Sequence, residues 1–155
     1  MGVIVKEVTG NLWQYYNRPG FVICITTNAT IKKNGEVVMG RGCAAECKHI
    51  LPDFPKKLGQ AIKEHGNVVL QPYNYGDHFP ECRVLSFPVK HNYWEDADLK
   101  LIKRSARRLK ELSKESEFIY ILPRPGCGNG NLKWEDVKKV LQKVKMPNEI
   151  WVISK

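Results

Sequence analysis

The sequence predicts an α/β fold, a three-layer α/β/α sandwich in which helices cover both faces of a mixed, largely parallel central sheet. Short β-branched runs alternate along the chain with helical patterns. The run Phe21–Thr26 is almost continuously apolar, which is typical of a strand buried on both faces. The segment from Glu95 to Lys114 repeats apolar residues at three- and four-residue spacing, which is typical of a helix with one buried face. These apolar residues are Leu99, Ile102, Ala106 and Leu109.

The other elements follow in order from similar signals. Gly66 ends one helix, and an Asn34-Gly35 pair predicts a tight turn in the long polar segment after the second strand. Glu135 and Asp136 open the last helix and lysines close it, as the helix dipole favours. We expect strands at Val3–Val8, Phe21–Thr26, Val68–Leu70, Arg83–Phe87, Phe118–Leu122 and Ile150–Ile153, and helical segments at Asn11–Tyr16, Gly42–Ile50, Phe54–His65, Glu95–Lys114 and Lys133–Lys145.

Length and composition indicate one globular domain, residues 1–155, without internal repeats. No apolar stretch is long enough to span a bilayer, so we expect a soluble, cytoplasmic monomer with no membrane association. The five cysteines are an odd number, which favours free thiols over disulfides. Lys and Arg number 25 against 16 Asp and Glu, a net charge of +9 that attracts polyanions or serves solubility alone.

Part of this charge is concentrated on the long helix predicted near the middle of the chain. A basic face of this kind can follow a nucleic-acid backbone, which makes a nucleic-acid contact possible. A solvated helix face, partly balanced by Glu111 and Glu115, is the interpretation we favour from the sequence. The basic residues are Lys100, Lys103, Arg104, Arg107, Arg108 and Lys110.

Two glycine-rich segments, Val38–Gly42 and Gly126–Gly130, each leave a predicted strand and lead towards a helix. Ligands of open α/β sheets bind beyond the carboxyl ends of the strands, and a helix N-terminus offers unpaired N–H donors to phosphate. Neither segment is a Walker loop or a G-x-G-x-x-G fingerprint. For either segment alone, a tight turn is the better interpretation.

Metal binding is not expected. Cys43, Cys47 and His49 have a C-x3-C-x-H spacing that matches no established zinc site, and small buried thiols explain them better. Cys127 has no identifiable base partner that would make it a nucleophile. We therefore expect neither a metal nor a cofactor.

Several motifs, taken in order, resemble the macro domain family over nearly the whole chain. Phe87-Pro88-Val89-Lys90, followed by Trp94, further resembles the branch that holds the terminal ADP-ribose protein glycohydrolase and the antitoxin that removes ADP-ribose from DNA. The motifs are Thr26-Thr27-Asn28, then Val38-Met39-Gly40-Arg41-Gly42-Cys43-Ala44, then Leu122-Pro123-Arg124-Pro125-Gly126-Cys127-Gly128, and finally Leu132-Lys133-Trp134-Glu135.

The resemblance implies that the chain binds ADP-ribose, with the diphosphate and distal ribose between the two loops. Arg41 could donate to phosphate or point to solvent. Asn11, with Leu12 beside it, stands where the family usually has an Asp that binds adenine, and Ile153 offers at best an apolar shelf for the base. The positions that match the loops are Asn28, Met39, Gly40, Arg41, Gly42, Gly126, Cys127, Gly128, Asn129 and Gly130.

Lys48 matches the nucleophilic lysine of the branch. Its spacing places it on one helical face with Ala44 and Ala45, and burial of that face would favour the neutral, nucleophilic amine. Alternatively, its stem covers apolar surface while its head reaches water. Gly130 stands where the protein-directed enzyme has an Asp that resolves the lysine adduct, whereas the DNA-directed antitoxin has glycine there as well. The missing Asp therefore argues against the protein-directed mechanism without excluding hydrolysis, and it also allows a reader without catalysis.

Three functions follow from these observations. The chain is an ADP-ribosyl hydrolase that acts on modified DNA or protein, a non-catalytic ADP-ribose reader, or a basic nucleic-acid-binding protein whose glycine loops are only turns. Phosphatase action on ADP-ribose 1″-phosphate, known in the wider family, is a lesser alternative.

Overall fold

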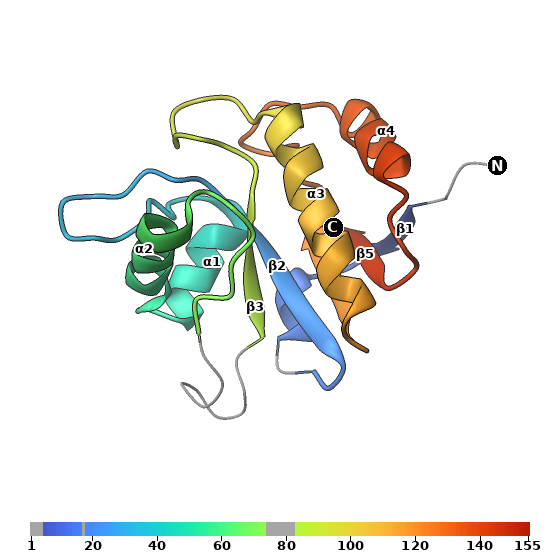
Figure 1. Cartoon of the computed structure of the whole chain (residues 1–155), viewed down its shortest axis with the longest axis horizontal. Coiled ribbons are helices and arrows are strands. Elements are labelled where there is room, and N and C mark those ends of the chain that lie inside the picture. The colour runs from blue at the N-terminus through green and yellow to red at the C-terminus, as the bar shows by residue number, and fades with distance from the viewer. Residues whose placement is uncertain (1–4, 17, 74–82) are drawn as a thin grey trace.

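A five-stranded parallel sheet forms the middle layer of the computed structural model, which describes residues 5–16, 18–73 and 83–155 (Figure 1). The strand order is β1-β5-β4-β2-β3, and every neighbouring pair is parallel. All the carboxyl ends of the strands therefore lie at the same edge. The strands are β1 (Lys6–Thr9), β2 (Phe21–Thr27), β3 (Val84–Pro88), β4 (Ile119–Pro123) and β5 (Ile150–Ser154).

Helices cover the two faces of the sheet in pairs. Figure 1 shows α1 and α2 on one side of the sheet and α3 and α4 on the other. This is the predicted three-layer arrangement. The helices are α1 (Gly42–Ile50), α2 (Phe54–His65), α3 (Leu99–Lys114) and α4 (Trp134–Val144), with a short 3-10 turn, η1 (Leu12–Tyr15), after β1.

Each face of the sheet has its own core because side chains alternate along the strands. In β2, Val22 and Cys24 pack with the residues of α3 and α4, whereas Ile23 and Ile25 pack with those of α1 and α2. All four are at most 5% exposed. The continuous apolar run that predicted this strand thus reflects burial on both faces.

Most predicted elements are confirmed to within a few residues, and two helices have the predicted bounds. The long helix begins at Leu99 rather than Glu95, because the Asp98 carboxylate accepts a hydrogen bond from Lys100 N at 2.9 Å and caps the helix there. The predicted strand Val68–Leu70 is wrong, since only Leu70 forms a bridge, antiparallel to Ser86. Val3, predicted to open the first strand, lies outside the described residues.

The Asn34-Gly35 turn is confirmed, and the segment around it contacts the start of α2. Ile31 and Val37 form an antiparallel bridge around it, and Gly35 has a φ of 88°. Val37 N donates to Pro55 O at 3.0 Å, which ties the turn segment to the start of α2. Within the described ranges, no helix is long and apolar enough to cross a membrane.

Replacing Gly59 in α2 by alanine should destabilise the fold. Alanine is favoured over glycine inside a helix by about 1 kcal/mol. Here, however, a Cβ at Gly59 would collide with the backbone oxygen of Gly35. Overpacking against a backbone atom costs about 1–3 kcal/mol, so we expect a net loss measurable by urea unfolding. Gln60→Ala, at an exposed position of the same helix, should unfold at or slightly above the wild-type midpoint. A Gly59→Ala protein as stable as Gln60→Ala would show that the turn and helix are not in contact.

Candidate functional site

The two glycine loops meet at the carboxyl edge of the sheet. The chain reaches the first loop, residues 38–42, by way of the turn segment that follows β2, and the second loop, residues 124–130, directly from β4. An atom at the Cβ position of Gly42 would lie 3.7 Å from Asn129 Nδ2. The loops that the sequence separates by more than eighty residues are therefore direct neighbours, as their shared place at the ends of parallel strands requires.

The first loop presents a run of unpaired backbone amides. In the part of the chain that the structure describes, the N–H groups of residues 39–44 donate to no protein acceptor. The run continues into the first turn of α1, whose N-cap residue Arg41 makes no side-chain capping bond. Unpaired amides at a helix N-terminus, together with the positive end of the helix dipole, favour an anion.

The second loop adds a further group of donors. No described acceptor pairs with the N–H groups of residues 128–130. Gly128 and Asn129 are exposed, and no atom lies within 4 Å of where a Cβ at Gly128 would be. Gly40 in the first loop has the same open surroundings. At these two glycines the missing side chain leaves the backbone accessible.

Gly126 and Gly130 are glycine for a different reason. Gly126 has a φ of 76°, and a Cβ there would lie 2.9 Å from both Ala97 Cβ and Ile102 Cδ1. A Cβ at Gly130 would lie 2.7 Å from Ala97 Cβ and would also collide with Gly126 O. Both glycines are buried against the segment that precedes α3. They shape the second loop from beneath and cannot carry a side chain in this conformation.

Asn28 holds the first loop in place. Its Nδ2 donates to Val38 O at 3.0 Å, and its Oδ1 accepts from Thr30 N at 2.9 Å. Behind the loop, Thr26 Oγ1 lies 3.5 Å from Cys43 Sγ, which joins β2 to the start of α1. The amide group of Asn28 is thus engaged with the protein, so its contribution to a ligand site is to position the loop.

The segment 89–98 forms a wall beside the second loop; the sequence predicts that His91 and Trp94 either line the pocket or cap the following helix. Lys90 Nζ donates to Asn129 O at 3.1 Å and to Tyr93 O at 3.3 Å. Ala97 N donates to Gly130 O at 3.0 Å. The Phe87–Lys90 motif pointed to this region, but a sequence cannot show that a lysine side chain fastens a loop that lies 39 residues further along the chain.

The residues predicted near adenine have mainly structural roles. Asn11 is exposed, but its Oδ1 accepts from Trp13 N at 3.0 Å and caps η1, which leaves one lone pair for another donor. Leu12 is 7% exposed and lies in the core beneath α1 and α2. Ile153 is 3% exposed in the same core, so the predicted apolar shelf is wrong: its side chain supports Gly10 from inside the protein.

Lys48 lies on the exposed side of α1. Ala44 and Cys47 are the buried residues of this helix, so the inward packing that would favour a neutral Lys48 amine is not present. The hydrogen bond from Asn34 and the charges of Lys32 and Lys48 lower the pKa of the Glu36 carboxyl group. Arg41 is exposed, and Met39 is buried in the core.

The described cysteines form no disulfide with one another. Burial raises the pKa of Cys24, Cys43 and Cys127, and Arg124 only partly offsets this at Cys127. A thiol with a raised pKa is a poor nucleophile at neutral pH. In residues 5–16, 18–73 and 83–155, no three His, Cys, Asp or Glu side chains are grouped to hold a metal ion.

Two curated proteins are similar to the chain in sequence. It is 29% identical over 112 residues to a DNA ADP-ribosyl glycohydrolase of Thermus aquaticus, an alignment that covers 68% of this chain and 30% of the relative. It is 26% identical over 145 residues to a DNA ADP-ribosyl transferase–DNA ADP-ribosyl glycohydrolase fusion protein of Thermosipho africanus, covering 79% and 37%. The chain thus spans about a third of the length of these relatives. No protein-family model matches it.

Solved structures show the same fold over nearly the whole chain. The macrodomain of Mycobacterium tuberculosis DarG superposes with a TM-score of 0.71 at 21% identity, covering 99% of both chains. The macrodomain of Thermus aquaticus DarG gives 0.68 at 24% identity, covering 98% and 99%. Thermosipho africanus DarTG in complex with ADP-ribose gives 0.72 at 21% identity, covering 96% of this chain and 41% of that one.

These superpositions show that the chain has the macro domain fold. In sequence it is similar to the two relatives named for DNA ADP-ribosyl glycohydrolase activity.

Alanine at Gly126 and at Gly128 should affect stability differently. At Gly126 the positive φ and the close contacts with Ala97 and Ile102 together cost about 2–4 kcal/mol, which chemical denaturation would detect as a lower midpoint. Gly128 does not have a positive φ and has open space beside it, so Gly128→Ala should unfold within about 0.5 kcal/mol of wild type. Equal losses in both variants would mean that the second loop is not packed as described.

Proposed function

We propose that the chain binds ADP-ribose between the two loops, with its diphosphate on the unpaired amides of residues 39–44 and 128–130. The meeting of these two groups of donors is the observation that carries the proposal. A diphosphate offers several anionic oxygens to donors on either side, and backbone amides positioned by a rigid sheet bind it without ordering any side chain. The similarity to a protein solved in complex with ADP-ribose supports the same ligand.

We further propose that the chain is a hydrolase that releases ADP-ribose from a macromolecule, as its curated relatives' names state for DNA. Lys48 is the proposed nucleophile. Its Nζ lone pair forms a bond to the anomeric carbon of the distal ribose, and the bond from that carbon to the macromolecule breaks. The leaving group takes up a proton, and water then displaces the lysine. Because Lys48 is exposed in the free protein, bound substrate has to exclude water from it.

A non-catalytic reader is the second candidate, because the second loop carries no acidic side chain at position 130. An aspartate that resolves a lysine adduct cannot occupy position 130, because its Cβ would collide with Gly126 O and approach Ala97 Cβ. A hydrolase with this second loop must therefore activate water by other means. A reader needs only the amide donors of the two loops.

ADP-ribose binding should depend on the open space at Gly128. A valine there would fill the space through which a phosphate reaches the neighbouring amides. We therefore expect Gly128→Val to weaken ADP-ribose binding at least tenfold in isothermal titration calorimetry. Its unfolding midpoint should change little. Gln60→Ala, on α2, should bind as wild type. Wild-type protein that gives no heat with ADP-ribose, or Gly128→Val protein that binds normally, would reject this site.

Turnover should depend on Lys48, whereas binding should not. Lys48→Ala and Lys48→Arg should lower single-turnover release from ADP-ribosylated DNA or protein by a factor of about 100 or more, since a covalent nucleophile has no substitute. Their ADP-ribose affinity should stay within threefold of wild type. Lys56→Ala, an exposed lysine of α2, is the matched control.

Two results separate the candidates. Full turnover by Lys48→Ala would exclude the lysine mechanism. Binding of ADP-ribose by the wild type without release from either substrate would identify a reader.

A further inference from the structure

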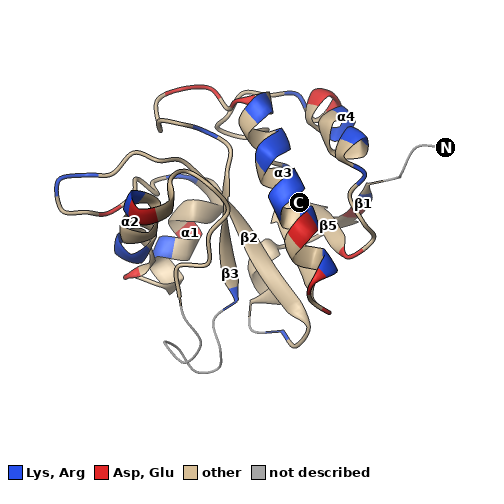
Figure 2. Ribbon diagram, viewed as in Figure 1, with Lys and Arg blue, Asp and Glu red and all other residues tan. Residues whose placement is uncertain are grey.

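The outer face of α3 carries a concentration of positive charge that the two loops do not use. Figure 2 shows Lys and Arg along the exposed side of this helix. In the described structure, the side chains of Lys100, Lys103, Arg104 and Arg107 have no ion-pair or hydrogen-bond partner. Unpaired arginines on successive turns are available to phosphate, which they bind through a planar fork of N–H donors.

Not every basic residue of the predicted face belongs to this surface. Lys110 Nζ donates to Val144 O at 2.8 Å and joins α3 to the end of α4. Arg108 NH1 lies 3.2 Å from the Glu111 carboxylate, which holds its guanidinium in place. Of the predicted basic face, the side chains without a described partner are therefore those from Lys100 to Arg107.

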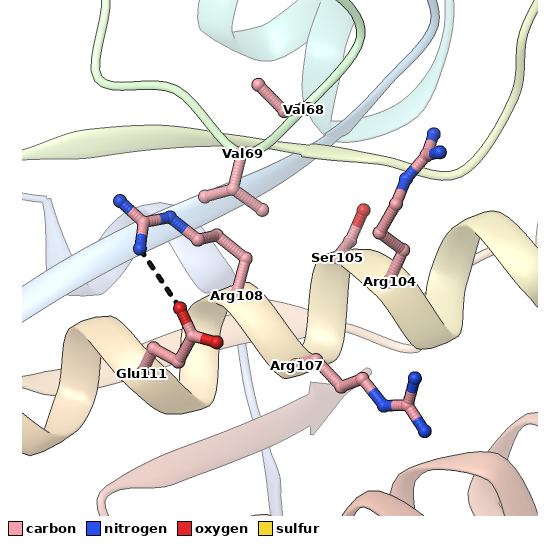
Figure 3. Close-up of a pocket in the computed structure, with 7 residues that line it drawn as sticks. All are labelled: Val68, Val69, Arg104, Ser105, Arg107, Arg108 and Glu111. Atoms are coloured by element: carbon pink, nitrogen blue, oxygen red, sulfur yellow. Dashed lines mark hydrogen bonds and ion pairs between the residues drawn. The ribbon is translucent and has the colours of Figure 1, made fainter.

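A hollow of about 350 Å³ runs beside this charged stretch. Val68 and Val69 line one side, and Arg104 and Arg108 extend from α3 on either side of Ser105 (Figure 3). Arg107, one turn further along the helix, also lines the hollow, and its guanidinium group points away from the two valines (Figure 3). The apolar valines can contact a sugar or a base while the arginines face phosphates, which is the mixture that a nucleic-acid strand offers.

Two exposed aromatic residues lie between this surface and the second loop. Tyr93 and Trp94 are 51% and 67% exposed, and their rings pack edge to face with centroids 5.2 Å apart. Their segment is fastened to the second loop through Lys90 and leads directly into α3. Exposed rings of this size are uncommon on a protein surface, and aromatic platforms of this kind stack nucleobases.

We propose that one strand of nucleic acid binds from the Tyr93–Trp94 pair along the basic outer face of α3. A base stacks on the aromatic pair, and the following phosphates contact Arg104 and Arg107. Arg104 and Arg107 lie about 8 and 12 Å along the helix axis from Leu99, a distance of a few nucleotides. The surface stands independently of ADP-ribose. We also assign this surface a role in holding an ADP-ribosylated strand, which makes nucleic acid the substrate class. This role rests on the proposed function.

The test is fluorescence anisotropy of the full chain with a labelled 15-nucleotide thymidine oligonucleotide, titrated at several salt concentrations. Affinity should fall with salt, and Arg104→Gln/Arg107→Gln should lower it at least fivefold at 50 mM salt. Loss of two phosphate contacts should reduce the slope of log affinity against log salt by about 1.4, at about 0.7 per contact. Trp94→Ala should lower the affinity about fivefold or more without changing the slope, because stacking releases no counterions.

Lys56→Gln/Lys63→Gln removes the same charge from exposed positions on α2 and is the matched control. An equal loss of oligonucleotide affinity in this control would show that the effect depends only on net charge, which would overturn the proposal. A polyglutamate peptide of equal charge that binds as tightly as the oligonucleotide would overturn it as well. ADP-ribose calorimetry on Arg104→Gln/Arg107→Gln should give wild-type affinity. If the wild type does not bind ADP-ribose but the oligonucleotide results hold, the proposed function fails while this surface stands.

Discussion

Unpaired backbone amides at the ends of parallel strands are the constraint on which this structure depends. Buried amides in a sheet or helix need a partner within the fold, because an unpaired polar group is costly away from water. The first loop and the start of α1 leave six consecutive N–H groups without a protein acceptor, and the second loop leaves three more beside them. An edge so rich in donors is stable where water or an anion completes it, and the sheet fixes both groups of donors at the same place.

Glycine serves this edge in two distinct ways. Gly40 and Gly128 are open to solvent, and their missing side chains expose the amides to a ligand. Gly126 and Gly130 are buried under the second loop, where neighbouring atoms leave no room for a Cβ. The segment Gly126–Gly130 therefore contains one glycine that leaves the backbone accessible to a ligand and two that are required for packing. The same packing excludes an acidic side chain at position 130, which restricts how a hydrolase with this loop could activate water.

The fold could be predicted from the sequence because burial leaves a clear periodic signal. The bounds of α1 and α2, the buried run of β2 and the apolar face of α3 all follow from local patterns. Val68–Leu70 failed as a strand because three apolar residues do not distinguish a ladder from a single bridge. Within the site, the two loops and their order along the chain could be predicted from the sequence. Their contact through Gly42 and Asn129 could not, and neither could the hydrogen bond from Lys90 that holds the second loop, because both join segments that are distant in the sequence. The exposure of Lys48 and the burial of Ile153 likewise depend on tertiary packing.

The central claim is that one diphosphate binds both groups of amides at once, and backbone amide chemical shifts measured during an ADP-ribose titration test it most directly. The account predicts that the amides of residues 39–44 and 128–130 shift together, with one common dissociation constant, while those of α2 do not move. Shifts confined to one loop, or two loops that titrate with different constants, would contradict it.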